Sequence, residues 1–138
     1  MAPPSDRDQK VMDEFRASGG SSATFGSDRP IVLLGTKGRK SGVLHTTPVM
    51  YRRDGASVVV FASKAGAPTS PNWFHNLVAN PTVTLEVGTD KYEATAAVAT
   101  GAERDRLYEA QSKEFPQFAE YQKKTTRQIP VVLLTKKS

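Results

Sequence analysis

The sequence has no cysteine, few histidines and no long apolar run. With no cysteine and only two histidines among 138 residues, disulfides, iron–sulfur clusters and thiolate zinc sites are excluded, and we expect no metal site. No apolar run reaches the roughly 18 residues that span a bilayer, and the N-terminus lacks the basic and apolar regions of a secretory signal. These absences predict a soluble, cytoplasmic protein.

The usual motifs of protein-based catalysis are missing as well. There is no Gly-x-Ser-x-Gly elbow and no His-Glu-x-x-His motif. The acidic residues Asp13, Glu14 and Glu103 fall in segments that read as ordinary solvated helix faces. An enzyme without reactive groups of its own usually takes its chemistry from a cofactor, so a catalytic function here implies a bound cofactor.

Size and charge narrow the class of protein further. A chain of 138 residues suits one compact domain and is too short for two ordinary domains with a cleft between them. The net charge of +5 and the pI near 9.6 predict an anionic partner. The basic residues form short groups, two of them inside turn signals, instead of one stripe. This favours a local anion pocket, and a nucleic-acid-binding β-barrel is the disfavoured alternative from another class.

Residues 1–29 are predicted to be a disordered leader over residues 1–7 and a short helix over residues 8–18. The helix has three apolar residues on one face: Val11, Met12 and Phe15. Three such residues bury too little area for stable membrane binding. We therefore expect the helix to pack on the core or to cover the site as a lid, with peripheral membrane contact as the alternative.

Residues 30–138 read as one domain of short strands joined by tight turns. The predicted strands cover residues 30–34, 44–52, 57–62, 83–87, 91–99 and 129–134, and two helices cover residues 72–80 and 101–115. Because hairpins rather than helical crossovers join the strands, we expect a mainly β (α+β) fold, an antiparallel barrel of about six strands with about three peripheral helices. Pro48 lacks a ladder donor, which implies a sheet edge, a bulge or an approach by something other than backbone.

The sharpest local feature is a Gly-bracketed turn at residues 35–42. It offers the cations Lys37, Arg39 and Lys40, two hydroxyls and flexible backbone N–H groups. Arg39 can form a bidentate fork with a phosphate, and Lys40 supplies a point charge. The Gly-Lys-Ser/Thr ending of a Walker A loop is absent. The turn therefore predicts an anion pocket, with a solvated basic hairpin as the alternative.

A second feature combines a small-residue loop with the start of a helix. Residues 62–68 hold a single lysine, Lys64, among small residues and proline, and the helix from Asn72 opens with an amide, an indole and an imidazole. Small residues let a planar ring or a phosphate approach the main chain, where Ser63 and Lys64 can contact it. Taken alone, Trp73 is more often a core residue and His75 more often a surface residue than a ligand.

In order along the chain, these segments resemble the signature blocks of the deazaflavin-dependent nitroreductase family. The matching blocks are residues 33–42, 47–48, 62–68, 72–81, 121–122 and 127–131. The resemblance implies a split β-barrel, related to the flavin-binding pyridoxamine-phosphate oxidase group, that binds coenzyme F420. It also implies transfer of the coenzyme's hydride to an electron-poor small molecule: an enone, a coumarin- or aflatoxin-type lactone, a quinone or a nitro compound.

The resemblance further implies roles for particular residues. The basic turn would meet the phosphate and the glutamate tail of the coenzyme. The implied coenzyme contacts are Arg39, Lys40, Ser41, His45, Thr46, Thr47, Pro48, Val49, Met50, Phe61, Ala62, Ser63, Lys64, Asn72, Trp73, Phe74, His75 and Asn76. The implied substrate pocket comprises Met50, Phe115, Phe118 and Tyr121. The implied catalytic residues, which stabilise developing charge and supply a proton, are Ser63 and Tyr121.

Three positions depart from the nitroimidazole-activating member of the family, which carries tyrosine where this chain has Met50, Phe115 and Phe118. Because those hydroxyls are lost, we expect quinones, lactones and enones rather than bicyclic nitroimidazoles as acceptors. An FMN-dependent oxidoreductase of the same barrel type is the alternative enzyme, since the basic turn suits the FMN phosphate equally well. A non-catalytic deazaflavin carrier is the alternative outside enzymes, and both a monomer and a homodimer are compatible with the sequence.

Overall fold

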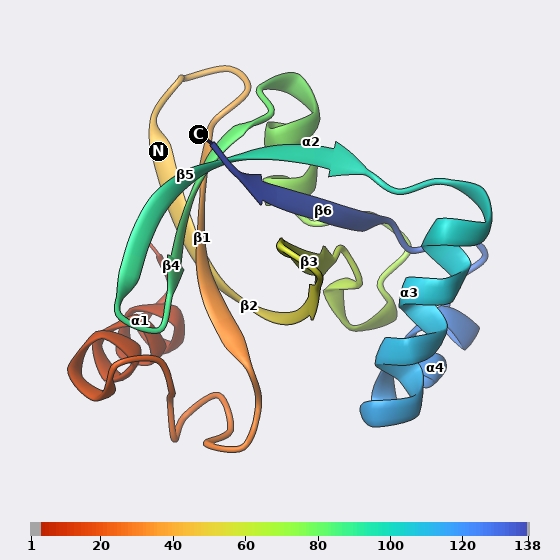
Figure 1. Cartoon of the computed structure of the whole chain (residues 1–138), viewed down its shortest axis with the longest axis horizontal. Coiled ribbons are helices and arrows are strands. Elements are labelled where there is room, and N and C mark those ends of the chain that lie inside the picture. The colour runs from red at the N-terminus through yellow and green to blue at the C-terminus, as the bar shows by residue number, and fades with distance from the viewer. Residues whose placement is uncertain (1–3, 138) are drawn as a thin grey trace.

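The fold is a closed antiparallel barrel of six strands (Figure 1). The computed structural model describes residues 4–137. The strands are β1 (Ile31–Lys37), β2 (Leu44–Asp54), β3 (Ser57–Phe61), β4 (Thr82–Val87), β5 (Asp90–Val98) and β6 (Val131–Lys136). They close in the order β1-β2-β3-β6-β5-β4, and every neighbouring pair is antiparallel. The predicted antiparallel barrel of about six strands is confirmed.

Strand β1 is buried on both faces, which explains its continuous apolar run. Val32 and Leu34 pack inside the barrel, whereas Ile31 and Leu33 pack outside against helices. All four are at most 2% exposed. A strand covered on both faces needs no polar residue at alternate positions, so burial rather than a period of two sets its composition.

Strand β1 also continues to Lys37, beyond the predicted end at Leu34. The prediction that Gly35 begins the turn is wrong, because Gly35 pairs with Thr46 on one side and Thr84 on the other. A Cβ at this glycine would collide with the Thr84 hydroxyl. Glycine is therefore needed here for close approach of the neighbouring strand, and the turn itself starts only after Lys37.

Within the described residues, four α-helices and one short 3₁₀ turn accompany the strands: α1 (Asp6–Ser18), η1 (Lys64–Gly66), α2 (Asn72–Ala79), α3 (Gly101–Glu114) and α4 (Gln117–Lys123). The expected three helices omit α4, which forms where only an aromatic segment is expected. Pro116, with φ of −58°, precedes its first residue, so the proline that ends α3 also starts the next helix. Figure 1 shows α3 and α4 side by side. Within residues 4–137 no helix has the length and apolar character to cross a membrane.

Helix α1 starts earlier than predicted and belongs to the core. The Ser5 hydroxyl accepts the Asp8 backbone N–H at 3.1 Å, which caps the helix and makes Asp6 and Arg7 helical. The predicted disordered leader is therefore wrong at Asp6 and Arg7, while residues 1–3 lie outside the described residues. The predicted packing on the core is confirmed, since the apolar face is at most 2% exposed: Val11, Met12 and Phe15.

The barrel is split along one edge of β2. Over residues 44–50 this strand pairs with β1 only, and its pairing with β3 begins at Tyr51. Pro48 lies in this stretch, opposite Leu33, so its missing N–H does not interrupt a two-sided ladder. Of the three alternatives that Pro48 leaves open in the sequence, the structure shows the sheet edge, and the candidate site lies along that edge.

Candidate functional site

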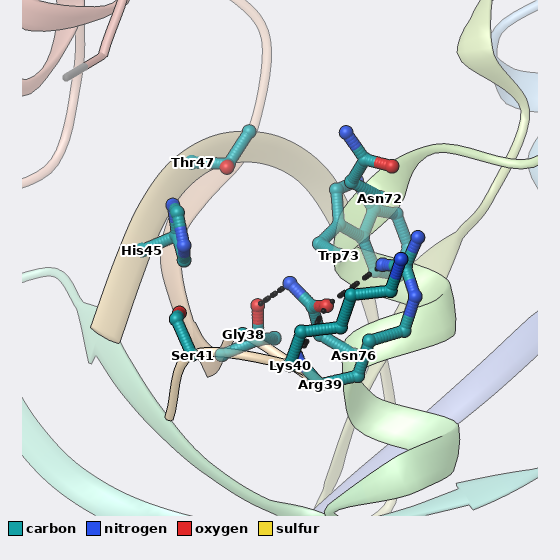
Figure 2. A pocket seen from close by; sticks show the side chains of 10 residues that line it. Gly38, Arg39, Lys40, Ser41, His45, Thr47, Asn72, Trp73 and Asn76 are labelled. Atoms are coloured by element: carbon teal, nitrogen blue, oxygen red, sulfur yellow. Dashed lines mark hydrogen bonds between the residues drawn. The ribbon is translucent and has the colours of Figure 1, made fainter. Parts of the chain in front are cut away.

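Two adjoining cavities form a groove along the free edge of β2. The larger has a volume of about 570 Å³ and lies between the β1–β2 turn and α2. The smaller, of about 220 Å³, lies between β2, the loop after β3 and α4. Thr47 and Trp73 line both, so the cavities meet at these two residues. Figure 2 shows the larger cavity, with His45 and Thr47 on one side and the α2 residues Trp73 and Asn76 on the other.

Asn76 holds the basic turn against α2. This side chain is 5% exposed, and its Oδ1 accepts both the Arg39 backbone N–H at 3.2 Å and the Arg39 guanidinium at 3.0 Å (Figure 2). Its Nδ2 donates to Thr36 Oγ1 at 3.3 Å. At Gly38 a Cβ would lie 2.6 Å from Ser41 Oγ, so a side chain there would displace the Ser41 hydroxyl. The asparagine thus fixes the main chain of the turn and occupies one guanidinium nitrogen, which leaves the others for a ligand.

The groove is positively charged along its whole length. Within the described residues no carboxylate lines either cavity, whereas Arg39 and Lys40 line the larger one and Arg29 and Lys64 the smaller one. The first turn of α2 adds the positive end of a helix, because no side chain caps it. Among residues 4–137, no group of three or more His, Cys, Asp or Glu side chains is placed to hold a metal ion. The arrangement can therefore bind an extended anion through cations and backbone N–H groups.

The loop after β3 has a strained backbone. Ser63 is in the right-handed region, and Lys64 and Ala65 follow with φ of 45° and 54°, in the left-handed region that non-glycine residues rarely adopt. A right-handed residue followed by a left-handed one turns successive N–H groups to the same side and makes a concave anion site. At Gly66, with φ of 84°, a Cβ would lie 2.7 Å from Tyr121 O on α4. The strained loop is thus packed tightly between the smaller cavity and α4.

Arg127 holds this loop from the opposite side. Its guanidinium donates to the carbonyl oxygens of Ala62, Ser63 and Ala67 at 3.2, 3.0 and 2.9 Å and to Ser70 Oγ at 3.2 Å. Burial lowers the pKa of Arg127 below its ordinary value, but an arginine stays protonated in a protein. These bonds use only oxygen atoms of the loop. The N–H groups of Gly66 and Ala67 are bonded within the loop itself, so those of Ser63 and Lys64 are the ones that can meet a ligand. From the sequence Arg127 belongs to one of the family blocks, but no role follows from that position.

Aromatic side chains of β3 and α4 form one wall of the smaller cavity. Phe118 packs edge to face on Phe61 and on Tyr121, with ring centroids 5.6 and 5.3 Å apart. The Tyr108 hydroxyl donates to Phe118 O at 2.6 Å. Burial raises the pKa of Tyr108 to about 12, so this donor keeps its proton at physiological pH. Tyr108 therefore positions α4, while Phe118 and Tyr121 line the cavity themselves.

Most of the predicted site residues lie on the groove. Those on the larger cavity are Arg39, Lys40, Ser41, His45, Thr47, Asn72, Trp73 and Asn76. Those on the smaller cavity are Thr47, Pro48, Val49, Met50, Phe61, Ser63, Lys64, Trp73, Phe118 and Tyr121. Five others line neither cavity: Thr46, Ala62, Phe74, His75 and Phe115. Of these, Ala62 is buried inside the barrel. Phe115 packs on the core cluster that lies between the barrel and helices α1, α3 and α4, here called the outer core cluster.

Six residues that line the cavities are absent from the prediction: Thr36, Gly38, Ala65, Pro71, Phe25 and Arg29. Four of them lie inside or beside segments that point to the site, so their position in the sequence is a usable signal. Phe25 and Arg29 precede the first strand and belong to no motif. The pairing of β1 with β2, in which Ile31 lies opposite Met50, brings the segment before β1 to the smaller cavity.

Known proteins of one family match this chain. The sequence model of the F420H(2)-dependent quinone reductase family matches residues 8–136. An F420H(2)-dependent quinone reductase of Mycobacterium tuberculosis is 40% identical over 111 residues, which cover 78% of this chain and 74% of that protein. A solved F420-H2 dependent reductase superimposes with a TM-score of 0.71 at 39% identity, covering 77% of this chain and 94% of its own. Another solved structure, described as a domain-swapped dimer, gives a TM-score of 0.72 at 36% identity, and the match covers 89% of this chain and 93% of that structure's chain.

The family match includes every residue that lines the two cavities. It agrees with the resemblance found in the signature blocks and with the split barrel. The expected enzyme class, an F420-dependent oxidoreductase, and the expected cofactor are therefore confirmed. The chain belongs to the F420H(2)-dependent quinone reductase family.

Proposed function

We propose that this chain binds coenzyme F420 along the groove and reduces a quinone-type acceptor in the smaller cavity. The observation that carries the proposal is that the two ends of the groove differ. A basic cavity of about 570 Å³ meets a cavity of about 220 Å³ with aromatic walls, and the two join at Thr47 and Trp73. A coenzyme with an anionic tail and a flat ring system has the complementary polarity. The residues present therefore fit the cofactor of the family.

The basic turn would hold the anionic end. Arg39 offers the guanidinium nitrogens that Asn76 does not occupy, and Lys40 adds a mobile point charge. Since Asn76 already orders the turn, less conformational entropy is lost when an anion binds. Ser41 and His45 line the same cavity and provide further polar contacts beside the cations.

The loop after β3 would hold the ring end. Ser63 and Lys64 present N–H groups from the concave turn, and Trp73 offers a flat apolar face where the cavities meet. When bound, the reduced deazaflavin supplies the hydride. The chain contributes position and exclusion of water, because Met50 and Phe118 keep the walls apolar and a dry site strengthens each polar contact.

The acceptor would lie against Met50, Phe118 and Tyr121. A quinone that takes up a hydride becomes a hydroquinone monoanion and then takes up one proton. The side-chain hydroxyl of Ser63 and the ammonium of Lys64 would stabilise the negative oxygen, and the Tyr121 hydroxyl or solvent would supply the proton. The absence of hydroxyls at Met50 and Phe118 favours quinones, lactones and enones over nitroimidazoles as acceptors.

Coenzyme binding and turnover test this proposal separately. Trp73 is the only tryptophan and lines both cavities, so its fluorescence reports binding of the oxidised coenzyme. The double variant Arg39→Ala/Lys40→Ala removes two charge-assisted contacts at exposed side chains, and we expect affinity to fall by about 3 kcal/mol, or about a hundredfold. Arg53→Ala, an exposed arginine of β2 that lines neither cavity, is the matched control.

The affinity should also weaken as salt rises, because exposed charges are screened. FMN titrated in parallel should bind more weakly than F420. Anaerobic oxidation of the reduced coenzyme by 2-methyl-1,4-naphthoquinone then tests turnover. Binding that is insensitive to both salt and the double substitution would contradict the placement of the anionic end, and binding without turnover would support a carrier instead.

A homodimer is the second part of the proposal. One solved relative with 36% identity is described as a domain-swapped dimer, and this supports a dimer over a monomer for the present chain. Light scattering on the purified protein gives the molar mass directly. A mass equal to one chain at micromolar concentration would contradict it.

A further inference from the structure

Residues 22–29, which lie outside the barrel, contribute one wall of the smaller cavity. Phe25 and Arg29 come from this segment and line the cavity. The segment is folded by two successive backbone bonds, since the Gly26 N–H donates to Ser22 O and the Arg29 N–H donates to Gly26 O, both at 2.9 Å. No motif in the sequence marks this wall, and neither residue has a place in the function proposed above.

Helix α1 anchors the segment. The Glu14 carboxylate accepts the Ser22 hydroxyl at 2.7 Å and both the N–H and the hydroxyl of Thr24 at 3.0 Å. Phe25 packs on the outer core cluster, and the Arg7 guanidinium lies 5.6 Å from the centroid of its ring. With these anchors, the segment presents Arg29 at a defined place on the cavity wall.

Among the described residues of this segment, Arg29 is the only charged one that lines the cavity, whereas its neighbour Asp28 does not line it. The Arg29 stem lies against Gly26, where a Cβ would meet Arg29 Cδ at 3.0 Å, so a side chain at residue 26 would crowd the arginine. Neither Arg29 nor Lys64, the other cation of the cavity, takes part in an ion pair within residues 4–137. The smaller cavity therefore combines apolar walls with two cations that no lining carboxylate neutralises.

This combination favours a flat ring that carries negative charge. We propose that Arg29, assisted by Lys64, determines acceptor specificity and selects quinones with an acidic oxygen substituent, such as a hydroxyquinone ionised at neutral pH. Hydride uptake by this anionic quinone gives a dianion, and the same cation stabilises it before it takes up two protons to become the neutral hydroxyhydroquinone. The inference rests on the proposed function, because it assigns the smaller cavity to the acceptor.

Calorimetry on the full chain saturated with oxidised F420 tests the specificity without turnover. The probes are 2-naphthoate and naphthalene-2-carboxamide, which are similar in shape and differ by one negative charge. The wild type should bind the acid about tenfold more tightly than the amide, and Arg29→Gln should remove most of that preference. Arg29→Lys should retain most of it, and Arg53→Gln, which removes a charge away from the groove, should retain all of it.

Turnover gives a second measurement on the same variants. For each protein we take the ratio of kcat/KM for 2-hydroxy-1,4-naphthoquinone to kcat/KM for 2-methyl-1,4-naphthoquinone. Comparing this ratio between wild type and variant cancels the different chemical reactivities of the two quinones. We expect the ratio to fall about fivefold to tenfold in Arg29→Gln, through the KM of the hydroxyquinone. Equal losses for both quinones would mean that Arg29 only supports the fold, and would overturn the inference.

The two proposals fail in different ways. If the chain does not bind oxidised F420 at all, the proposed function fails before the acceptor is tested. If F420 binds normally while Arg29→Gln keeps the wild-type preference for 2-naphthoate, the specificity role of Arg29 is wrong and the proposed function stands. Thermal unfolding of each variant separates loss of fold from loss of recognition.

Discussion

The substitution Arg127→Met should release the loop that forms one end of the groove. Methionine keeps much of the apolar stem but removes every donor, so the carbonyl oxygens of Ala62, Ser63 and Ala67 and the Ser70 hydroxyl lose their partner. A hydrogen bond to a charged group contributes about 1.5–3 kcal/mol when buried. Because this site is only half-buried, water can replace part of the loss.

We therefore expect the free energy of unfolding to fall by about 2–4 kcal/mol. For a domain of this size that corresponds to a decrease in Tm of roughly 8–16 °C. The matched control is Arg106→Met, because Arg106 also forms a two-pronged contact, at 3.3 and 3.1 Å to Asp54, but is 58% exposed. Because water screens this exposed pair, the control should lose much less stability than Arg127→Met.

Three measurements check the prediction. Thermal denaturation followed by circular dichroism gives the change in Tm, and amide exchange at Gly66 and Ala67 reports opening of the loop, since both N–H groups are bonded within it. Trp73 fluorescence gives the affinity for oxidised F420, which should fall because the N–H groups of the loop are no longer held in place. If Arg127→Met loses no more stability than Arg106→Met and leaves exchange unchanged, the loop does not depend on this clamp.

Two further predictions concern the packing of the same loop and the anchoring of residues 22–29. Gly66→Ala should lower the free energy of unfolding by roughly 2–3 kcal/mol, because a Cβ at φ of +84° would lie 2.7 Å from Tyr121 O. The control Gly55→Ala, at φ of +59° with nothing within 4 Å, should lower it by about 1 kcal/mol. Equal losses of stability in urea denaturation would refute the tight packing. The Thr24 N–H and two hydroxyls hold the pKa of Glu14 below its ordinary value of 4.5, so its carboxylate stabilises the fold above that value and the contribution disappears as pH falls through the folded-state pKa. Wild type should thus lose more stability than Glu14→Gln between neutral pH and around pH 3, and identical losses would show that this carboxylate does not matter.

The hairpins and the helix of the site could be predicted because their signals are local. The Asp-Gly pair before Ala56 marks the β2–β3 turn, where Gly55 has φ of 59°, and Asn80-Pro81 marks the end of α2. Gly35 shows the limit of such signals. In the sequence it opens a turn, but in the barrel it allows close approach of β4, and nothing local separates these two uses of glycine.

The candidate site divides in the same way. The cations of the turn, Arg39 and Lys40, are recognisable from the glycine and charge pattern around them. Arg127 and Arg29 are not, because their roles depend on distant parts of the chain. Arg127 contacts Ala67 across 60 residues of sequence, and Arg29 lines the same cavity as Phe118, which lies far from it in the sequence. Composition cannot tell such arginines from solvated ones.

Both anchors of the groove leave free the groups that an anion needs. Asn76 takes the main-chain N–H and one guanidinium nitrogen of Arg39, so the turn is rigid while most of the guanidinium stays unpaired. Arg127 takes only oxygen atoms of the loop after β3, and Ser63 and Lys64, which form the concave turn of this loop, both line the smaller cavity. A strained loop and an exposed basic turn would otherwise relax by bonding to themselves. Hydrogen-bond donors that are held rigidly and have no partner can stabilise the negative charge that develops during hydride transfer, because the protein does not have to reorganise when that charge forms.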